Sequence, residues 1–354
     1  MEWCSQVSDT DRRSFILSYR TIRVSACIVS LILVLAAVPT VFAEEQVLIA
    51  YGGHNESIAP MWIGIARGFF RKYGLDVRLV QVRSGAMIMS ALASRDIPVG
   101  WPAVTSVLNA ASGGLRISFV ASPTRKIIRN LMVRKEIKSL DDLRGKVLGV
   151  QSIGGGNWLQ TMIVLDALGV DPNKYGLKTR IIGDETAITQ ALLSEIIDAA
   201  VLPYSFSEVL KRSGFRSLAD AADLNAPYQG SGMAALRDVL ANSPDLIIGL
   251  VKGMIEAVVF IHDRSNKQEV MDILKKNLRL AKAEDAEASY KVLSLMTSLD
   301  VGPNLETWKN IRRILSPLNP KVGQVELSQV LDGSFVNSLE EDRFLPEMRK
   351  KIGR

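Results

Sequence analysis

Two stretches of the chain, roughly a hundred residues apart, repeat one order of apolar and polar positions. In each stretch, short runs of branched apolar residues alternate with segments whose apolar side chains recur every three or four positions. This alternation predicts strand, helix, strand, helix, strand. The motif Lys-Tyr-Gly-Leu marks the start of the second strand in both copies, at 72–75 and 174–177. The pattern therefore predicts an α/β protein built from two similar units with parallel strands and right-handed crossovers.

The first copy begins at residue 46, and the second occupies about 146–215. In the first copy we expect strands at 46–51, 75–82, 97–101 and 117–121, and helices at 59–72 and 86–93. Between the copies, an extended segment leads to Ser-Leu-Asp-Asp at 139–142, whose side-chain oxygens predict a helix start because they accept free backbone N–H groups. Since parallel strands end on one edge of a sheet, we expect two sets of loops to face each other across a cleft.

The pattern becomes helical after a returning strand at 232–236. Asn-Ser-Pro at 242–244 predicts a helix start, with a capping side chain and a proline in the first turn. We expect the helical tail to pack on the first unit. Its later helices are expected at 266–278, 284–298 and 304–315. The predicted division is a first lobe of residues 44–126 and 232–354, a second lobe of residues 127–231, and hinges near 123–129 and 230–234.

The first 43 residues have the pattern of a secretory signal peptide. Two arginines precede a small and apolar run at 24–38, and Val-Phe-Ala at 41–43 has the small residues that a signal peptidase reads. Cleavage is predicted between Ala43 and Glu44. A retained membrane anchor is the weaker interpretation because the run is short for a span. Twin arginines at 12–13 leave a second export route open.

Composition and charge exclude several classes of function. The chain carries a net charge of +6, but its basic residues are scattered among acids, and no nucleic-acid-binding motif accompanies them. The two histidines, His54 and His262, are isolated, so no metal site is expected. Cys4 and Cys27 both fall in the leader, so the mature chain should have no disulfide and no thiol chemistry. No catalytic triad, carboxylate pair or cofactor motif can be assembled.

A glycine-rich loop in the second unit is the strongest candidate for contact with a ligand. It lies between the strand at 147–151 and a helix that begins near Trp158, and its residues are Gly154, Gly155, Gly156 and Asn157. Glycines let a backbone approach a ligand closely, and free N–H groups at a helix start attract an anion. The loop has no Walker sequence. The alternative interpretation is a tight turn between strand and helix.

Further candidates come from the ends of the other predicted strands. The matching loop of the first unit contains Gly52, Gly53 and His54, and pocket-lining and exposed-loop interpretations of the histidine stay open. Aromatic rings would supply apolar walls, and hydroxyl and backbone groups would supply hydrogen bonds. For Asp184 two interpretations stay open: it is only the cap of the helix at 185–193, or it reaches the cleft, where it would suit a ligand that carries an amine. The other candidates are Ser84, Gly85, Trp101, Ser122, Asp184, Pro203 and Tyr204.

Four segments resemble a known family. They are 68–77 (Gly-Phe-Phe-Arg-Lys-Tyr-Gly-Leu-Asp-Val), 139–146 (Ser-Leu-Asp-Asp-Leu-Arg-Gly-Lys), 197–200 (Ile-Asp-Ala-Ala) and 242–246 (Asn-Ser-Pro-Asp-Leu). Together they look like the ABC-transporter substrate-binding proteins of the aliphatic-sulfonate, taurine, nitrate and thiamine-pyrimidine-precursor (SsuA-like) group. The resemblance covers 46–340. It implies a type II periplasmic-binding-protein fold, with a small molecule held in a cleft between two α/β lobes and a helical C-terminal extension on the first lobe.

The resemblance also implies where the ligand is held. The family's cleft contacts correspond to the fourteen candidate positions named above. The sequence departs from the family pattern at Arg95, where a glycine is usual, and at Pro98, where an acid is usual. Apart from Arg83 no basic clamp is evident, which puts an anionic ligand in doubt. Fungal pyrimidine-forming relatives of this fold carry a cysteine cluster, which is lacking in the mature chain.

The resemblance and the leader predict a non-enzymatic periplasmic receptor. It would deliver a small organic molecule to the permease and ATPase of an ABC importer at the inner membrane. We expect a monomer that uses no cofactor or metal and binds no nucleic acid. The alternatives are a secreted enzyme of the same fold, of the pyrimidine-precursor type, and a ligand-sensing domain that meets a signalling partner.

Overall fold

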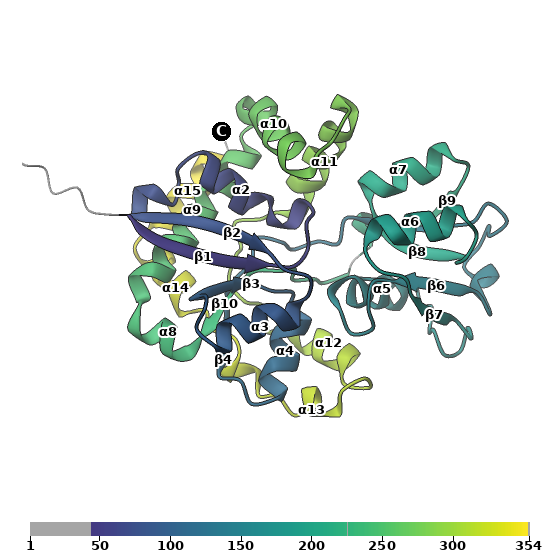
Figure 1. The fold of residues 1–354 in the computed structure, drawn as a ribbon, viewed down its shortest axis with the longest axis horizontal. Helices are drawn as coiled ribbons and strands as arrows, with labels where there is room; N and C mark the ends of the chain where they lie inside the picture. The colour runs from purple at the N-terminus through teal and green to yellow at the C-terminus, as the bar shows by residue number, and fades with distance from the viewer. Residues whose placement is uncertain (1–43, 225, 353–354) are drawn as a thin grey trace, which may run out of the picture. The chain divides into compact units, whose positions relative to one another are not determined.

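The computed structural model describes residues 44–224 and 226–352 (Figure 1). The leader, its cleavage site after Ala43 and both cysteines lie outside these residues, so the predictions about them stay predictions. The described part contains two five-stranded sheets with helices around each.

The first sheet has the strand order β2-β1-β3-β10-β4. Strand β1 pairs in parallel with β2 and β3, while β10 runs antiparallel to both β3 and β4. Its strands are β1 (Glu45–Tyr51), β2 (Leu75–Gln81), β3 (Val99–Trp101), β4 (Ile117–Ala121) and β10 (Met233–Leu236). The helices between them are η1 (Glu56–Ile58), α2 (Ala59–Ala66), η2 (Arg71–Tyr73), α3 (Gly85–Ala93) and α4 (Val104–Ser112).

The second sheet repeats this plan in the order β7-β6-β8-β5-β9. Strand β6 is parallel to β7 and β8, and β5 is antiparallel to β8 and β9, so the predicted repeat of two α/β units is confirmed. Its strands are β5 (Arg129–Val133), β6 (Val147–Val150), β7 (Lys178–Ile181), β8 (Ala199–Pro203) and β9 (Arg216–Asp220). Its helices are η3 (Asp141–Leu143), α5 (Gly156–Ala167), α6 (Glu185–Leu193), α7 (Tyr204–Arg212) and η4 (Ala221–Asp223).

A helical tail follows β10, as the sequence predicts. It comprises α8 (Arg237–Asn242), α9 (Pro244–His262), η5 (Arg264–Asn266), α10 (Lys267–Leu278), α11 (Ala283–Met296), α12 (Leu305–Leu315), α13 (Pro320–Gly323), η6 (Leu327–Gln329), α14 (Ser334–Glu341) and α15 (Phe344–Ile352). Helix α9 shares the core of the first sheet through Leu250 and Met254, which pack in one cluster with Leu75 and Val77 of β2. Burying these side chains is the main force that holds the tail in place.

The tail also touches the second unit. Helix α11 contacts α7, and α12 contacts α5. Trp308 of α12 is fully buried, and its ring lies 4.9 Å from that of Phe119 in β4. The same hydrophobic cluster includes Leu159 of α5. The tail therefore bridges the two units and does not cover the first one alone.

Three local predictions are wrong. The helix expected at 59–72 ends at Ala66, because Gly68 takes a left-handed conformation (φ 67°). The helix expected from residue 139 is only the single turn η3, where Asp142 accepts the N–H groups of the two residues at 138–139 at 2.9 Å each. Only Arg144 separates η3 from the left-handed Gly145, which leaves no room for a second turn. At α9 the proline is in the first turn as predicted, but Ser243 makes no capping bond.

Candidate functional site

The two glycine loops occupy matching places in the two sheets. Gly52, Gly53 and His54 follow β1, and Gly154 and Gly155 follow β6, the strand with the same place in the second sheet. Each loop leads directly into a helix, η1 in the first unit and α5 in the second. The sequence therefore located the two loops correctly with respect to the strands.

The second glycine loop is shaped by close contacts. Gly154 has a left-handed backbone (φ 76°), which favours glycine. A Cβ at Gly155 would lie 2.4 Å from Ser152 Oγ, and one at Gly156 would lie 3.4 Å from Cβ of Ala103, which follows β3 in the first unit. The contact at Gly156, the first residue of α5, is an ordinary van der Waals distance, so this position does not require glycine. Gly154 and Gly155 each have a structural reason in the folded protein alone, the backbone conformation and the close contact respectively.

Asn157 holds this loop in place through two side-chain hydrogen bonds. Its side chain is 6% exposed. Its Oδ1 accepts the Gln151 N–H at 3.1 Å, and its Nδ2 donates to the Val201 carbonyl at 3.3 Å. Both ends of the amide are therefore engaged in holding β6, the loop and β8 together.

His54 is exposed but held at both ring nitrogens. Nε2 lies 2.9 Å from the Asn277 carbonyl oxygen, and Nδ1 lies 2.9 Å from the Tyr51 hydroxyl. A carbonyl only accepts, so Nε2 carries the proton and Nδ1 accepts from the tyrosine. The ring also lies 5.1 Å from that of Trp62. These contacts connect the loop after β1 to the end of α10.

The two predicted aromatic walls have different surroundings. Trp101 is 2% exposed and packs in the core of the first sheet, but its indole Nε1 is buried without a hydrogen-bond partner. Tyr204 is half-buried, donates its hydroxyl to Asp220, and packs with Ile128 and Val292. Burial and the Asp220 carboxylate raise the pKa of Tyr204 above its ordinary value. Trp101 thus offers an N–H donor, whereas the hydroxyl of Tyr204 is already engaged.

Four of the remaining predicted residues belong to the local structure of the two units. Ser84 caps α3 by accepting the Met87 N–H at 3.4 Å, and Asp184 caps α6 by accepting the Ala187 N–H at 2.9 Å. A Cβ at Gly85 would lie 1.9 Å from the hydroxyl oxygen of a serine in α4. Pro203 is the buried last residue of β8. The cap interpretation of Asp184, which the sequence left open, is the one its hydrogen bond matches.

A buried charged cluster was missed by sequence reasoning. Arg129, the first residue of β5, is 7% exposed, and its Nη2 lies 3.2 Å from Glu185 Oε1 of α6, while its Nη1 is buried without a partner. Glu56 of η1 is 4% exposed and accepts the Ser289 hydroxyl at 3.0 Å. Burial raises the pKa of Glu56, and the opposing charge of Arg129 partly offsets this rise.

Two neutral residues extend this cluster. Tyr228 is 6% exposed and accepts a hydrogen bond from Gln160 Nε2 of α5 at 2.7 Å, while Gln160 Oε1 is buried without a partner. Burial raises the pKa of Tyr228, and the positive charge of Arg129 lowers it in part. The charge of Arg129 thus acts on Glu56 of the first unit and on Tyr228, which is hydrogen-bonded to α5 of the second, and we call Glu56, Arg129, Gln160, Glu185 and Tyr228 the Arg129 cluster. An arginine directly after two isoleucines in the predicted extended segment was the signal that could have revealed it.

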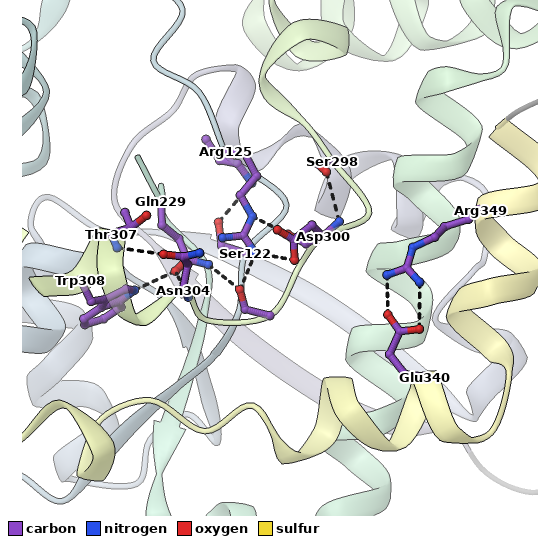
Figure 2. A network of polar contacts seen from close by, with 12 residues as sticks. Ser122, Arg125, Gln229, Ser298, Asp300, Asn304, Thr307, Trp308, Glu340 and Arg349 are labelled. Carbon is purple, nitrogen blue, oxygen red and sulfur yellow. Dashed lines mark hydrogen bonds and ion pairs between the residues drawn. The ribbon is translucent and has the colours of Figure 1, made fainter. Parts of the chain in front are cut away.

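A polar network ties the segments that connect the two sheets to the tail (Figure 2). Ser122 donates its backbone N–H to Val301 and its hydroxyl to Ser231, at 2.8 and 2.9 Å. The guanidinium of Arg125 donates to the carbonyls of Asp300 and Gly302, and burial lowers the pKa of Arg125. Ser122 therefore uses its polar groups in joining the chain segments, although the sequence suggested a ligand contact.

Gln229 completes the network from the second connecting segment (Figure 2). It is fully buried, donates to the Gly302 carbonyl at 3.0 Å, and accepts the Asn304 N–H at 3.1 Å and the Trp308 indole N–H at 2.7 Å. The loop between α11 and α12 is thus hydrogen-bonded to both connecting segments.

A family model described as NMT1/THI5 like matches residues 55–266. The chain belongs to this NMT1/THI5-like family. No curated protein matches the chain by sequence.

Solved structures agree on the fold. The periplasmic aliphatic sulphonate binding protein SsuA from Escherichia coli matches with a TM-score of 0.66 and 20% identity, over 81% of this chain and 92% of that one. The periplasmic nitrate-binding protein NrtA from Synechocystis PCC 6803 matches with a TM-score of 0.65 and 14% identity, over 87% and 90%. A Candida albicans gene product with the generic periplasmic binding protein fold matches with a TM-score of 0.60 and 16% identity, over 82% and 99%. The predicted periplasmic-binding-protein fold is confirmed, and the family match over residues 55–266 supports the predicted resemblance.

The two departures from the family pattern lie at the approach to β3. Arg95 adopts a left-handed backbone (φ 65°), and its side chain forms an ion pair with Asp238. Pro98 immediately precedes β3 and is half-buried. The strand forms in the expected place despite both changes.

In the described part of this family member, no helix is long and apolar enough to cross a membrane, and no three metal-binding side chains gather.

Proposed function

We propose that this chain is a non-enzymatic receptor of the NMT1/THI5-like family, which captures a small organic molecule in the periplasm. It would deliver this molecule to the permease and ATPase of an ABC importer in the inner membrane. Residues 44–126 and 232–354 would form one lobe and residues 127–231 the other, with hinges near 123–129 and 230–234. The family match and the fold shared with sulfonate- and nitrate-binding proteins support this role.

The buried cluster around Arg129 is the observation that carries the proposal. A buried guanidinium nitrogen without a partner is costly, because it has lost its hydrogen bonds to water and gained none in exchange. Gln160 Oε1 is a second unpaired group in the same cluster. A ligand that offers an acceptor to Arg129 and a donor to Gln160 would satisfy both. The cluster draws on both units, so such a ligand would engage both and favour the closed form.

This assignment revises the ligand chemistry expected from the sequence. Arg83, the only basic clamp evident there, is exposed. Arg129 is buried and has a free donor, so an oxygen-rich ligand such as a carboxylate or sulfonate fits the proposal. Glu56 and Glu185 already offset part of the charge of Arg129. A ligand that combines an acidic group with a donor group therefore fits better than a simple inorganic anion.

A thermal-shift screen of the mature chain tests this function. The panel should contain sulfonates, aromatic and aliphatic carboxylates, amino acids, pyrimidines and nitrate, because a specific ligand raises the melting temperature by mass action. For the best ligand, Arg129→Lys and Gln160→Met should each weaken binding by about 10- to 100-fold in calorimetry, since a hydrogen bond to a charged group contributes about 1.5–3 kcal/mol. Arg144→Lys is the matched control, since Arg144 is exposed and stacks on Tyr175.

Two results would overturn the proposal. Turnover of the ligand by the purified protein would indicate an enzyme. Unchanged affinity in both cluster variants, with melting curves like those of the wild type, would place the ligand elsewhere. Genes for a permease and an ATPase beside this gene would support transport over a signalling role.

A further inference from the structure

A basic cavity lies in the first unit, and none of the fourteen candidate residues or the Arg129 cluster lines it. Its volume of about 740 Å³ falls in the range of small-molecule sites. Three parts of the chain form it. They are the end of α4 with the turn into β4, the first residue of α8, and the segment from α13 to residues 329–330, which lies next to β4. These segments meet because the Arg237 N–H donates to the Arg116 carbonyl at 3.0 Å, which continues the pairing of β10 with β4.

Positive charge dominates the lining of the basic cavity. It contains Arg116, Arg237 and Lys321, against the single acid Glu326. Within the described residues, none of these three cations takes part in an ion pair or a side-chain hydrogen bond. Arg237 Nε is buried and has no partner. Asp238, the acid next to it in sequence, pairs with Arg95 instead.

A second cavity in the same unit serves as a comparison, because the cations that line it all have partners within the protein. It has a volume of about 530 Å³ and is lined by the loop at 299–305 and by α14. Its three cations are all engaged. Arg349 faces Glu340 with both terminal nitrogens (Figure 2), Lys309 pairs with Glu306 at 2.8 Å, and Arg312 donates to a carbonyl at 2.8 Å. Unpaired cations therefore distinguish the basic cavity from its neighbour, although both are large.

Three like charges line one cavity, and no acid is paired with any of them in the described residues. Their like charges repel, and the buried Arg237 Nε has exchanged water for no partner. With Glu326 counted, the lining carries two net positive charges, which a dianion would neutralise. Arginine recognises phosphate oxygens with its planar set of donors, and lysine adds a point charge. Gln324 and Gln329 supply neutral donors.

We propose that the basic cavity binds a phosphate group through Arg116, Arg237 and Lys321. The phosphate belongs either to a free phosphorylated solute or to the headgroup of an anionic phospholipid. The site is separate from the proposed solute site and does not depend on the proposed transport function.

Calorimetry and vesicle sedimentation with residues 44–354 test this site. The probes are inorganic phosphate, glycerol 3-phosphate, and vesicles of phosphatidylcholine with and without phosphatidylglycerol. Binding of the free phosphates without vesicle binding would support a solute, and binding only to phosphatidylglycerol vesicles would support a headgroup. Arg237→Gln should weaken binding about tenfold through loss of a charge-assisted hydrogen bond. Arg116→Gln combined with Lys321→Gln should abolish it.

Control variants separate the loss of phosphate binding at this cavity from a loss of charge elsewhere and from a loss of folding. Lys309→Gln removes the same charge from the neighbouring cavity and should leave phosphate binding unchanged. Arg116 and Lys321 are exposed, so their variants should fold even if Arg237→Gln does not. No binding of any probe at millimolar phosphate would overturn the proposal. So would equal binding by wild type and the Arg116→Gln/Lys321→Gln variant.

Discussion

The motif Lys-Tyr-Gly-Leu occurs once in each α/β unit, and the two copies have different partners. In the first copy, Lys72 and Tyr73 both bind Glu256 of α9, with the tyrosine hydroxyl 2.5 Å from the carboxylate. In the second copy, the ring of Tyr175 lies 4.2 Å from the guanidinium of Arg144, a residue of the same unit. The backbone is nevertheless alike, because the glycine of each copy is left-handed. The motif sets the turn, and tertiary packing sets what its side chains do.

The edge strands that follow the motif show the same difference. In β2, Leu75 and Val77 are 4% and 5% exposed, because α9 covers them. In β7 no residue is buried, and Ile181 is 60% exposed. An equivalent strand is therefore part of a core in one unit and a surface edge in the other. Whether a helix such as α9 packs on the strand, and not the strand itself, decides how far its side chains are buried.

The largest expected loss of stability comes from disturbing the packing of α9 on the first unit. A Cβ at Gly253 of α9 would lie 2.3 Å from the ring of Phe70, which is 1% exposed. Gly253→Val should therefore lower the free energy of unfolding by about 3 kcal/mol through overpacking. Urea unfolding measures this loss. Adding Phe70→Leu should recover part of it; if the double variant is no more stable than Gly253→Val, the close contact is not the cause.

A smaller effect should separate the two tyrosines of the motif. Tyr73→Phe removes a hydrogen bond to a carboxylate and should cost about 1.5 kcal/mol. Tyr175→Phe removes a hydroxyl that makes no hydrogen bond in the described structure and should cost less than about 0.5 kcal/mol. Both are measured by urea unfolding at neutral pH. Equal losses in the two variants would contradict the comparison.

The smallest effect should be seen at alkaline pH. Burial, and then the hydrogen bond and charge of Glu256, raise the pKa of Tyr73. The unfolded chain then releases this proton near pH 10 while the folded chain keeps it, so stability is lost as pH rises above about 10. Between pH 10 and 11 the wild type should lose about 1 kcal/mol that Tyr73→Phe does not lose. Tyr175→Phe should keep the wild-type slope, and a slope unchanged in Tyr73→Phe would refute the coupling.

The order of the elements and the positions of the glycine loops follow from the sequence alone. Strand and helix periodicity, and glycines such as Gly74 and Gly176, act over a few residues, so they can be recognised without knowing what packs on them. The repeated α/β unit, the returning strand β10 and the helical tail were predicted for this reason. The division into lobes and the assignment of ligand contacts stay predictions.

Only the tertiary structure decided how the polar side chains are used. Asn157 and Ser122 looked free in the sequence, but partners up to 109 residues away along the chain engage them. Arg129 looked like one of many scattered cations, but β8 and β9 pair with its strand on both sides and bury it with an unpaired nitrogen. Burial and hydrogen-bond partners depend on segments distant in sequence, and no local pattern encodes which segments will meet.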